Sequence, residues 1–407
     1  MEHVVVVGGS LAGLRACEQL RTAGFAGTVT LIGAEVHLPY DRPPLSKKLL
    51  AGDWEPDRIH LRKPTEFETL DITLRLGVRA VGLDTVAARV TLDDASTEPY
   101  DGLIIATGAT PRRLPGQPDA AGIHVLRTLD DSLGLRAELV AGRRVVVIGA
   151  GFIGLEVSAT AHGRGCAVTV LEGAAAPMIR GLGAAMGTAV ASVHERHGVE
   201  IRCGVQVEAI EVDAGRVRGV ALGDGTVVPA DVVVVGVGVA PATEWLSGSG
   251  LHVTDGIVCD RTLAAAPGVY AAGDCARWTN PLFGAAGEEM RVEHWTNAAE
   301  QGAAAAVNLL AVAAGEAPEP YAPVPFFWSD QFESRIQFVG RAAGADDEEV
   351  RVVAGDPSGS FVALYGHRGR LRGALGVSMP KLVMPYRKLL AERASWEQTL
   401  EHATGVT

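Results

Sequence analysis

Apolar residues in this chain gather into short runs that end at glycines, and two of these runs are followed by a helix-like segment. Residues 4–13 read VVVVGGSLAG, and residues 145–156 read VVVIGAGFIGLE. Continuous β-branched runs are typical of parallel strands that are buried on both faces. The two segments therefore predict two strand–loop–helix units, each at the start of a layered α/β domain.

The first loop has the composition of a phosphate-binding turn. Its glycines let the backbone turn sharply and approach a pyrophosphate, which then lies on the amides at the start of the next helix. Ser10 stands where a second glycine is usual, and it is small enough to permit a close approach. The next strand, TVTLIGAE, ends near Glu35, where a carboxylate on a ribose hydroxyl is expected. The candidate residues of this loop are Gly8, Ser10, Ala12 and Gly13. A glycine-rich turn of some other α/β protein remains the alternative for a single match of this kind.

The second loop repeats the pattern, and two such matches make a glycine-rich turn of some other α/β protein a weaker explanation. After it come a helix and the strand AVTVLE, which ends at Glu172. An acid about 20 residues beyond the first glycine accepts hydrogen bonds from both hydroxyls of an NAD ribose, whereas NADP favours a nearby arginine. Glu172 is followed by Gly-Ala-Ala, with no adjacent base, so the sequence predicts NADH. The loop candidates are Gly149, Gly151, Ile153 and Gly154.

Three further segments fit a chain that holds two dinucleotides. The strand in YDGLIIATGATPRRLPG enters a turn at Thr107 and Gly108, where we expect the chain to cross to a second domain. The strand in ADVVVVGVGVAPAT, with Gly236 and Gly238, is expected to bring it back. In TLAAAPGVYAAGDCA, Asp274 is expected to open a helix, where it either accepts from a ribityl hydroxyl or serves only as an N-cap.

Composition and charge exclude several other classes of protein. The 407 residues are 47% apolar and 21% charged, which is typical of globular domains rather than disordered chains. The net charge of −12 argues against general nucleic-acid binding. No apolar run has the roughly 18 residues of a membrane helix, and no signal peptide is recognisable. We therefore expect no nucleic-acid or membrane partner.

The five cysteines suggest neither a metal site nor a disulfide framework. They form no CxxC or other close pair, so no metal site is predicted. A chain of this kind is expected in the cytoplasm, where thiols stay reduced.

Several longer segments resemble the FAD-dependent, putidaredoxin reductase-like ferredoxin reductases of oxygenase systems. The most specific are LPYDRPPLSK, LRTLDD, IGAGFIGLE, YAAGDCA, VEHWTNAAEQG and FFWSDQF, and the resemblance covers essentially the whole chain. It implies an α/β fold with two Rossmann-like, glutathione-reductase-like dinucleotide-binding domains and a C-terminal α/β domain. The implied boundaries are 1–110 and 243–320 for the FAD domain, 111–242 for the NAD domain and 321–407 for the last domain.

The resemblance also implies which residues contact the cofactors. The family acid on the FAD ribose can stand where this chain has Ala34, so Glu35 would have to substitute for it. Arg42 would supply positive charge beside reduced, anionic flavin. The family positions that contact FAD correspond here to Ala12, Lys47, Ala80, Arg127, Asp274 and Trp295.

The segment YDRPPLSKK contains no thiol, although disulfide-reducing relatives carry redox cysteines in this part of the first domain. We therefore expect that electrons do not pass from the flavin through a redox-active disulfide. In the family, the carboxylate equivalent to Glu156 approaches the flavin edge and the Ser-Lys lysine, so we predict an ion pair between Lys47 and Glu156 as the catalytic pair. The alternative is that Glu156 only favours its helix N-terminus and that Lys47 reaches solvent.

The function implied by the resemblance is transfer of electrons from NADH through FAD to a [2Fe–2S] ferredoxin that serves a monooxygenase or a ring-hydroxylating dioxygenase. Two alternatives remain open: a reductase for rubredoxin or a quinone, and a signalling flavoprotein like apoptosis-inducing factor. GHRGRLRG predicts a basic hairpin with Arg368, Arg370 and Arg372 on one strand face, which is a candidate docking surface for an acidic ferredoxin. A merely solvated face is the other interpretation.

Overall fold

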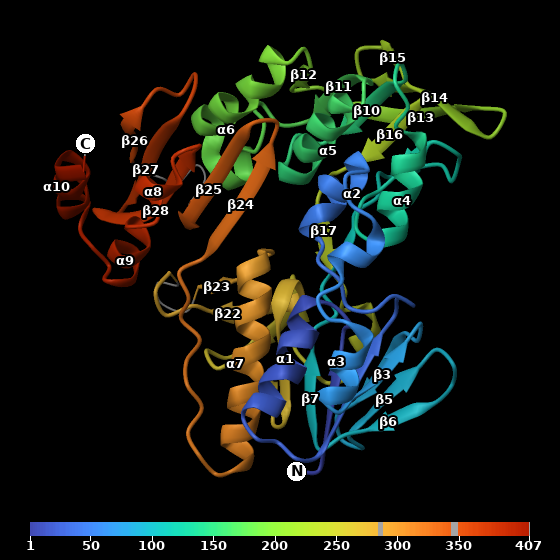
Figure 1. Cartoon of the computed structure of the whole chain (residues 1–407), viewed down its shortest axis with the longest axis vertical. Helices are drawn as coiled ribbons and strands as arrows, with labels where there is room; N and C mark the ends of the chain where they lie inside the picture. The colour runs from blue at the N-terminus through green and yellow to red at the C-terminus, as the bar shows by residue number, and fades with distance from the viewer. Residues whose placement is uncertain (284–287, 343–348, 407) are drawn as a thin grey trace. The chain divides into compact units, whose positions relative to one another are not determined.

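The structure is a computed structural model that describes residues 1–283, 288–342 and 349–406 (Figure 1). The chain divides into two compact units, each built from separate segments. Unit 1 comprises residues 1–41, 59–110 and 240–325, and unit 2 comprises residues 42–58, 111–239 and 326–407.

Unit 1 is built on a six-stranded sheet of order β20-β21-β7-β1-β2-β3, in which β21, β7, β1, β2 and β3 run parallel. Two smaller sheets, β4-β5-β6 and β18-β19-β22-β23, complete the unit. Its strands are β1 (His3–Val7), β2 (Thr28–Gly33), β3 (Ile72–Leu76), β4 (Ala80–Asp84), β5 (Arg89–Leu92), β6 (Thr97–Pro99), β7 (Gly102–Ile105), β18 (Val253–Thr254), β19 (Gly256–Cys259), β20 (Ala264–Ala266), β21 (Val269–Ala271), β22 (Ala276–Thr279) and β23 (Glu289–Met290).

The helices α1 (Leu11–Thr22) and α7 (Trp295–Ala313) lie side by side in unit 1 (Figure 1). Their close approach depends on Gly302, since a Cβ there would lie 2.2 Å from the carbonyl oxygen of Ala12. The short helix α3 (Pro64–Thr69) precedes β3. The valine run of β1 is buried in the centre of the sheet, as a central parallel strand requires.

Unit 2 contains a second parallel sheet, of order β12-β11-β10-β16-β9. Beside it stands a three-stranded antiparallel sheet, β13-β14-β15. These strands are β9 (Ile123–His124), β10 (Arg144–Ile148), β11 (Ala167–Glu172), β12 (Glu200–Cys203), β13 (Val207–Asp213), β14 (Arg216–Leu222), β15 (Val227–Pro229) and β16 (Val232–Val235), and the helices are α2 (Lys48–Ala51), α4 (Leu129–Glu138), α5 (Phe152–Gly163) and α6 (Ile179–Arg196).

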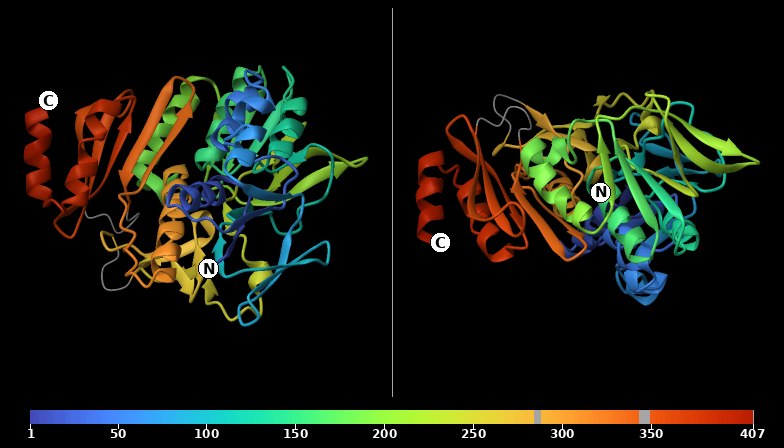
Figure 2. Two further views of the ribbon diagram at one scale, coloured as in Figure 1. Left: turned by 60° about the horizontal axis from the view of Figure 1, so that its bottom comes forward. Right: turned by 90° about the horizontal axis from the view of Figure 1, so that it is seen from above.

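The last part of the chain forms an antiparallel five-stranded sheet of order β24-β25-β28-β27-β26, drawn in orange to red in Figure 2 beside short helices. Its elements are β24 (Phe326–Gln331), β25 (Ser334–Gly340), β26 (Glu349–Gly355), β27 (Phe361–His367), β28 (Arg370–Val377), α8 (Pro380–Val383), α9 (Tyr386–Ala391) and α10 (Trp396–Val406). Buried residues of this sheet, such as Phe338, join one hydrophobic core with Leu155 and Val190 of α5 and α6. The hydroxyl of Tyr365 also donates to the carbonyl of Leu182, at 2.8 Å. This sheet therefore packs on the parallel sheet's helices as part of the same unit.

The chain passes between the two units within the paired strands β8 (Ala109–Pro111) and β17 (Val239–Pro241). The exact domain boundaries implied by the sequence stay a prediction. Among the described residues, no helix has both the length and the apolar character that crossing a membrane requires.

Two local expectations differ from the structure. Gly273 and Asp274 open only the three-residue 3-10 helix η4 (Gly273–Cys275), which leads directly into β22, and no α-helix follows them there. The predicted basic hairpin exists between β27 and β28, but Arg368 lies in its turn with a positive φ of 49°, so only Arg370 and Arg372 alternate along the strand. The two-residue turn Arg368-Gly369 has positive φ at both positions, which the twist of a tight hairpin favours.

Candidate functional site

In the first glycine loop of unit 1, Gly8 and Gly13 lie so close to neighbouring backbone atoms that neither position has room for a side chain. Gly8 has a φ of 129°, and a Cβ there would lie 2.0 Å from the carbonyl oxygen of Ala106. A Cβ on Gly13 would lie 2.0 Å from the carbonyl oxygen of Gly8. Ser10 precedes α1 in extended conformation, so the amides of the first turn follow directly after it. The loop therefore presents backbone N–H groups at the carboxyl end of β1, as a pyrophosphate requires.

The second loop, in unit 2, has the same construction. A Cβ on Gly149 would lie 2.3 Å from the carbonyl oxygen of Gly236, and one on Gly154 would lie 2.1 Å from that of Gly149. At Gly151, by contrast, no atom of the described residues, apart from its neighbours along the chain, lies within 4 Å of an added Cβ. Two glycines are thus required for packing, while the middle one faces open space beside the helix N-terminus. Ile153 in the first turn of α5 is 47% exposed. This is the space that a dinucleotide's phosphates need.

Glu172 lies where the fingerprint places the ribose acid, at the carboxyl end of β11. Its carboxylate accepts hydrogen bonds from the backbone N–H of Ala150, at 2.7 Å, and of Ala174, at 2.8 Å. These bonds fix the carboxylate against the second glycine loop. A carboxylate has about four acceptor positions. Two of them therefore remain for the hydroxyls of a ribose.

Gly236 and Gly238 follow β16 near the second loop. The N–H of Gly236 donates to the carbonyl of Ile148, at 2.8 Å, which extends the pairing of β10 with β16 to the carboxyl ends of these strands. Gly238 has a φ of 98° and open space around its Cβ position. In unit 1, Gly108 has a φ of 72°, and the hydroxyl of Thr107 donates to the carbonyl of Ala242, at 2.8 Å. Both turns thus lie where the chain changes unit.

Two of the other predicted FAD residues of unit 1, Glu35 and Trp295, bond to the segment after β2. The carboxylate of Glu35 accepts a hydrogen bond from the hydroxyl of Tyr40, at 2.5 Å. The indole N–H of Trp295, at the start of α7, donates to the carboxylate of Asp41, at 2.6 Å. Ala80 is buried at the start of β4.

The turn η4 offers a polar site that fits FAD. Asp274 is inside the turn and does not cap a helix, so the N-cap interpretation is wrong. The amide oxygen of Gln301 accepts from the N–H of Gly273, at 2.8 Å. Gln301 is fully buried, and its amide nitrogen has no hydrogen-bond partner among the described residues. A buried donor without a partner is costly, and a polar cofactor group would satisfy it.

Arg42 and Arg127 lie in unit 2 and contact each other. The guanidinium of Arg42 donates to the carbonyl of Arg127, at 2.5 Å. The N–H of Arg127 donates to the carboxylate of Asp131, at 3.0 Å, which caps α4. The structure thus places these two predicted FAD residues and Lys47 in unit 2, while the other predicted FAD residues lie in unit 1.

Lys47 and Glu156 form an ion pair, as predicted, in which Glu156 is buried and Lys47 is partly buried. Lys47 Nζ lies 2.6 Å from Glu156 Oε2, and their side chains are 18% and 7% exposed. Ser46 donates to the same oxygen, at 2.5 Å, and Ser329 donates to Oε1, also at 2.5 Å. Two hydroxyls and one ammonium thus hold the carboxylate near the start of α5. The interpretation in which Lys47 only reaches solvent is wrong.

The segment 43–47, which carries Lys47, is held in place by hydrogen bonds from side-chain hydroxyls of two helices to its backbone carbonyl groups. Pro43 and Pro44 begin the 3-10 helix η1 (Pro43–Ser46), in which their fixed φ suits the first positions. The hydroxyl of Thr160 on α5 donates to the carbonyl of Ser46, at 2.7 Å, and that of Ser132 on α4 donates to the carbonyl of Leu45, also at 2.7 Å. The segment is therefore docked on the two helices that flank the pair.

All five cysteines are free thiols, and no disulfide is formed. Burial raises the pKa values of Cys17, Cys259 and Cys275 well above the usual thiol value. Such thiols are poor nucleophiles, because the thiolate is the reactive form. None of the five thiols forms a disulfide in this structure, and these three buried ones are poorly suited to disulfide exchange.

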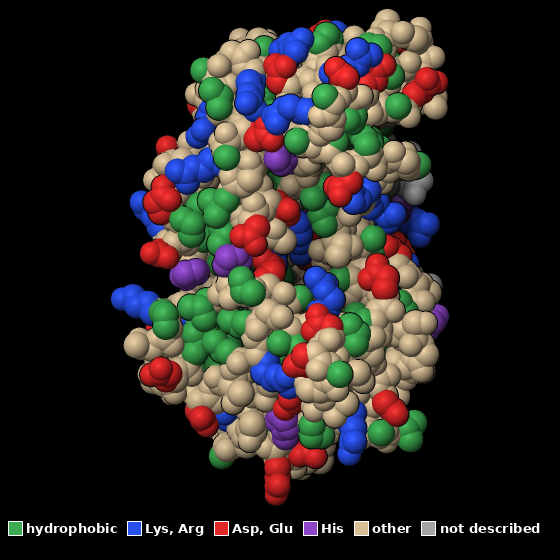
Figure 3. Space-filling view, turned by 90° about the vertical axis from the view of Figure 1, so that its right-hand side faces the viewer, with side chains coloured by type: hydrophobic (Ala, Val, Ile, Leu, Met, Phe, Trp, Pro, Cys, Tyr) green, Lys and Arg blue, Asp and Glu red, His purple; other side chains and the backbone are tan. Residues whose placement is uncertain are grey.

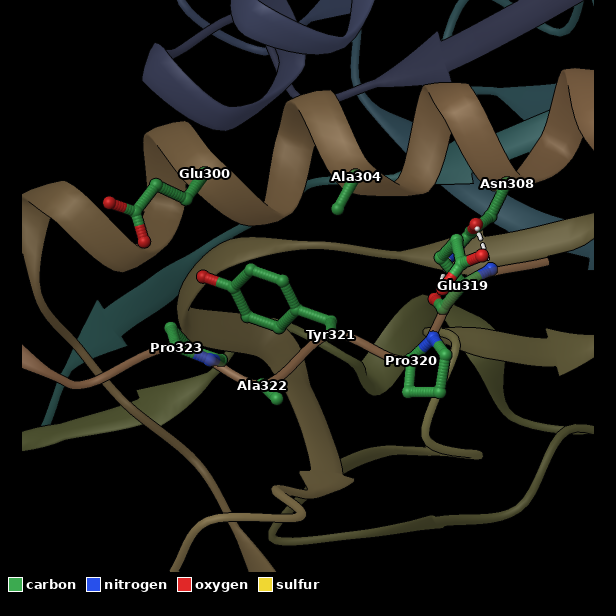
Figure 4. A pocket seen from close by; sticks show the side chains of 8 residues that line it. All are labelled: Glu300, Ala304, Asn308, Glu319, Pro320, Tyr321, Ala322 and Pro323. Carbon is green, nitrogen blue, oxygen red and sulfur yellow. Dashed lines mark hydrogen bonds between the residues drawn. The ribbon is translucent and has the colours of Figure 1, made fainter. Parts of the chain in front are cut away.

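A shallow pocket elsewhere in unit 1 is formed between α7 and the segment after it (Figure 4). Asn308 donates to the carbonyl of Glu319, at 2.9 Å, and accepts from its N–H, at 2.9 Å. These bonds tie the segment to the helix. The pocket includes no residue of either glycine loop, and its lining residues are Glu300, Ala304, Asn308, Glu319, Pro320, Tyr321, Ala322 and Pro323.

Sequence reasoning did not assign roles to Ser46 and Ser329, which hold Glu156. The sequence does contain an indication of the role of Ser329. In FFWSDQF, Ser329 and Gln331 stand two positions apart, and both are buried in β24. Buried polar residues at every second position of a strand indicate partners on the facing element.

Comparison with known proteins agrees with this architecture. The family model described as pyridine nucleotide-disulphide oxidoreductase matches residues 2–302, and a model described as reductase C-terminal matches residues 326–402. Rhodocoxin reductase of Rhodococcus erythropolis is 41% identical over 95% of this chain and 89% of that protein. The ferredoxin–NAD(+) reductase component of the anthranilate 1,2-dioxygenase system of Burkholderia cepacia is 39% identical over 96% and 94%.

Among solved structures, the reductase in the covalent putidaredoxin reductase–putidaredoxin complex matches with a TM-score of 0.91 and 32% identity, over 100% of this chain and 98% of that chain. The fold predicted from the sequence, with two dinucleotide-binding domains and a C-terminal α/β domain, is thereby confirmed. With two glycine loops, a ribose acid and a matching family model over most of its length, this chain belongs to the pyridine nucleotide-disulphide oxidoreductase family, and within it resembles the ferredoxin reductases.

Proposed function

We propose that this protein is an FAD-dependent ferredoxin–NAD(+) reductase that passes electrons from NADH to a [2Fe–2S] ferredoxin of an oxygenase system. The observation that carries the proposal is the buried pair of Lys47 and Glu156 on a segment without thiols, together with two glycine loops. The names of the relatives support a ferredoxin as the acceptor, rather than rubredoxin or a quinone.

FAD, when bound, supplies the conversion of a two-electron hydride transfer into single-electron steps. The protein's own residues bind and orient. The loop at Gly8 and Gly13, the turn at Gly273 and the amide of Gln301 would hold the cofactor in unit 1. Lys47, fixed by Glu156, would supply positive charge at the reacting end of the flavin.

The nucleotide site of unit 2 favours NADH. Glu172 is already fixed by two backbone N–H groups, so it cannot move away from a 2′-phosphate without losing both bonds. A phosphate there would meet a like charge and find no adjacent base in residues 173–175. Repulsion of the wrong ligand is an effective source of specificity.

The ferredoxin is expected to dock on a local basic surface. The chain has a net charge of −12, and acidic and basic side chains are interspersed on the face in Figure 3. Arg368 and Arg370 are exposed at the tip of the β27–β28 hairpin, and Arg372 is partly buried. Attraction between this hairpin and an acidic partner would raise the association rate and weaken as salt screens it.

The test compares two acceptors. With NADH as donor, ferredoxin-dependent cytochrome c reduction should fall as salt rises, whereas reduction of ferricyanide, which needs no docking protein, should change little. Charge reversal at Arg368 and Arg370 should raise the KM for ferredoxin and leave that for NADH unchanged. Cytochrome c reduction that is independent of added ferredoxin would refute the proposed acceptor.

We also propose a cytoplasmic location, supported by the five free thiols, since disulfides are rare where thiols are kept reduced. The domain boundaries 1–110 with 243–320, 111–242 and 321–407 are proposed on the family resemblance.

A further inference from the structure

Glu156 is the end of a longer hydrogen-bonded chain that reaches into the core of unit 2. Ser329 donates to Glu156 Oε1, at 2.5 Å, and the amide nitrogen of Gln331 donates to Ser329 Oγ, at 3.1 Å. The amide oxygen of Gln331 lies 2.8 Å from His194 Nε2. As whole residues, all four are between 0% and 6% exposed. The chain thus links α6 through β24 to the carboxylate on α5.

The chemistry of these groups fixes the direction of every bond. A carboxylate only accepts, so Ser329 must donate to it and must accept from the amide nitrogen of Gln331. The amide oxygen of Gln331 then faces His194, so Nε2 of the histidine must carry the proton. All three donors therefore point toward Glu156, and hydrogen bonds in such a chain strengthen one another.

The far end of the chain is closed. His194 Nδ1 has no hydrogen-bond partner among the described residues, and the ring of Phe332 lies 5.1 Å away between centroids. Burial lowers the pKa of His194, which keeps the imidazole neutral. His162 and His197 also lie close enough to disfavour its positive charge. A chain that ends at an unpartnered nitrogen has no route onward for a proton, so it can orient and polarise the carboxylate but cannot conduct.

We propose that Ser329, Gln331 and neutral His194 are positioning residues that hold the Glu156 carboxylate toward Lys47 and so set the rate of hydride transfer from NADH. The inference rests on the proposed function, because it concerns the same ion pair. With Ser329 absent, the carboxylate keeps Lys47 and Ser46 on one oxygen only, so it can rotate about its last bond.

The functional test is anaerobic stopped-flow reduction of the flavin holoenzyme by NADH. Ser329→Ala and Gln331→Leu should each lower the limiting rate about tenfold, or about 1.4 kcal/mol in the barrier, with the Kd for NADH within about twofold of wild type. Ser329→Thr, which keeps the hydroxyl, should restore the rate. Thr399→Val is the matched control, since it removes another fully buried hydroxyl of unit 2, which donates to the carbonyl of Ser395, directly before α10.

A double-mutant cycle separates positioning from general damage. In a Glu156→Gln background, Ser329→Ala should lower the rate no further, because the group it positions has gone. An equal loss in both backgrounds, or wild-type rates in both single variants, would overturn the inference. If Glu156→Gln itself leaves flavin reduction unchanged, the proposed role of the ion pair fails, which is a different result from failure of the chain alone.

A structural readout tests the chain without activity. In holoenzyme labelled with [15N]histidine, the signal missing from His194→Gln should show a neutral ring protonated on Nε2, and Gln331→Leu should shift it. A ring protonated on Nδ1, or a charged ring at neutral pH, would contradict the direction of the chain.

Discussion

Replacing Lys47 by methionine tests whether the buried pair matters to the fold as well as to catalysis. Methionine keeps most of the apolar stem of the side chain but removes the charge 2.6 Å from Glu156. Breaking a buried pair by removing one partner typically costs about 3–5 kcal/mol, because a buried charge is left uncompensated. Glu156 retains the hydroxyls of Ser46 and Ser329, so the lower end, about 3 kcal/mol, applies here.

The next residue along the chain offers a control. Lys48 pairs with Asp53 at 2.8 Å, but their side chains are 59% and 53% exposed. Exposed pairs contribute about 0–1 kcal/mol. The two variants thus remove the same chemical group from neighbouring positions and differ mainly in burial.

Calorimetric unfolding with saturating FAD in every sample gives the comparison. A loss of about 3 kcal/mol in a unit of this size should lower Tm by about 6–12 °C for Lys47→Met, while Lys48→Met should shift it by less than about 4 °C. Lys47→Met should also slow reduction of the flavin by NADH. Equal Tm values for the two variants, together with wild-type flavin reduction in Lys47→Met, would refute the reasoning.

Three further predictions concern the nucleotide site and the thiols. Glu172→Arg should lower the ratio of kcat/KM for NADH to that for NADPH at least tenfold, or about 1.4 kcal/mol, and an unchanged ratio would show that Glu172 does not line the ribose. Gly154→Ala should weaken NADH binding in calorimetric titration, because its Cβ would lie 2.1 Å from a loop carbonyl, whereas Gly163→Ala on the same helix has open space and should bind NADH normally. Thiol-blocking reagents should leave turnover intact, because burial raises the pKa values of most of the thiols; loss of activity with FAD retained in a Cys→Ser variant of Cys17, Cys166, Cys203 or Cys259 would reopen a disulfide route.

The glycine loops could be predicted from the sequence because their signal is local. Gly8 and Gly149 stand directly after buried strands, at positions where a positive φ and a close carbonyl exclude any side chain. Glu172 was likewise predictable, since it ends the next strand at a spacing that the fold requires.

The supports of Glu156 could not be predicted in the same way. Ser46 lies 110 residues from Glu156 in the chain, and Ser329 lies 173 residues from it. The packing of η1 against α5 brings the first hydroxyl to the carboxylate, and the packing of β24 against α5 brings the second. The shortness of the helix that opens at Gly273 could not be predicted for a related reason, because η4 ends where β22 begins, and β22 is paired with β19, which lies earlier in the chain.

The most direct test of the account is an anaerobic titration with NADH of a mixture of the FAD-loaded protein and a [2Fe–2S] ferredoxin. The visible absorbance of the iron–sulfur cluster monitors the reduction of the ferredoxin. NADH delivers two electrons and each ferredoxin accepts one, so two ferredoxins should be reduced per NADH oxidised, at a rate proportional to the catalytic amount of reductase. If NADH bleaches the flavin while the ferredoxin stays oxidised, the protein is not a ferredoxin reductase.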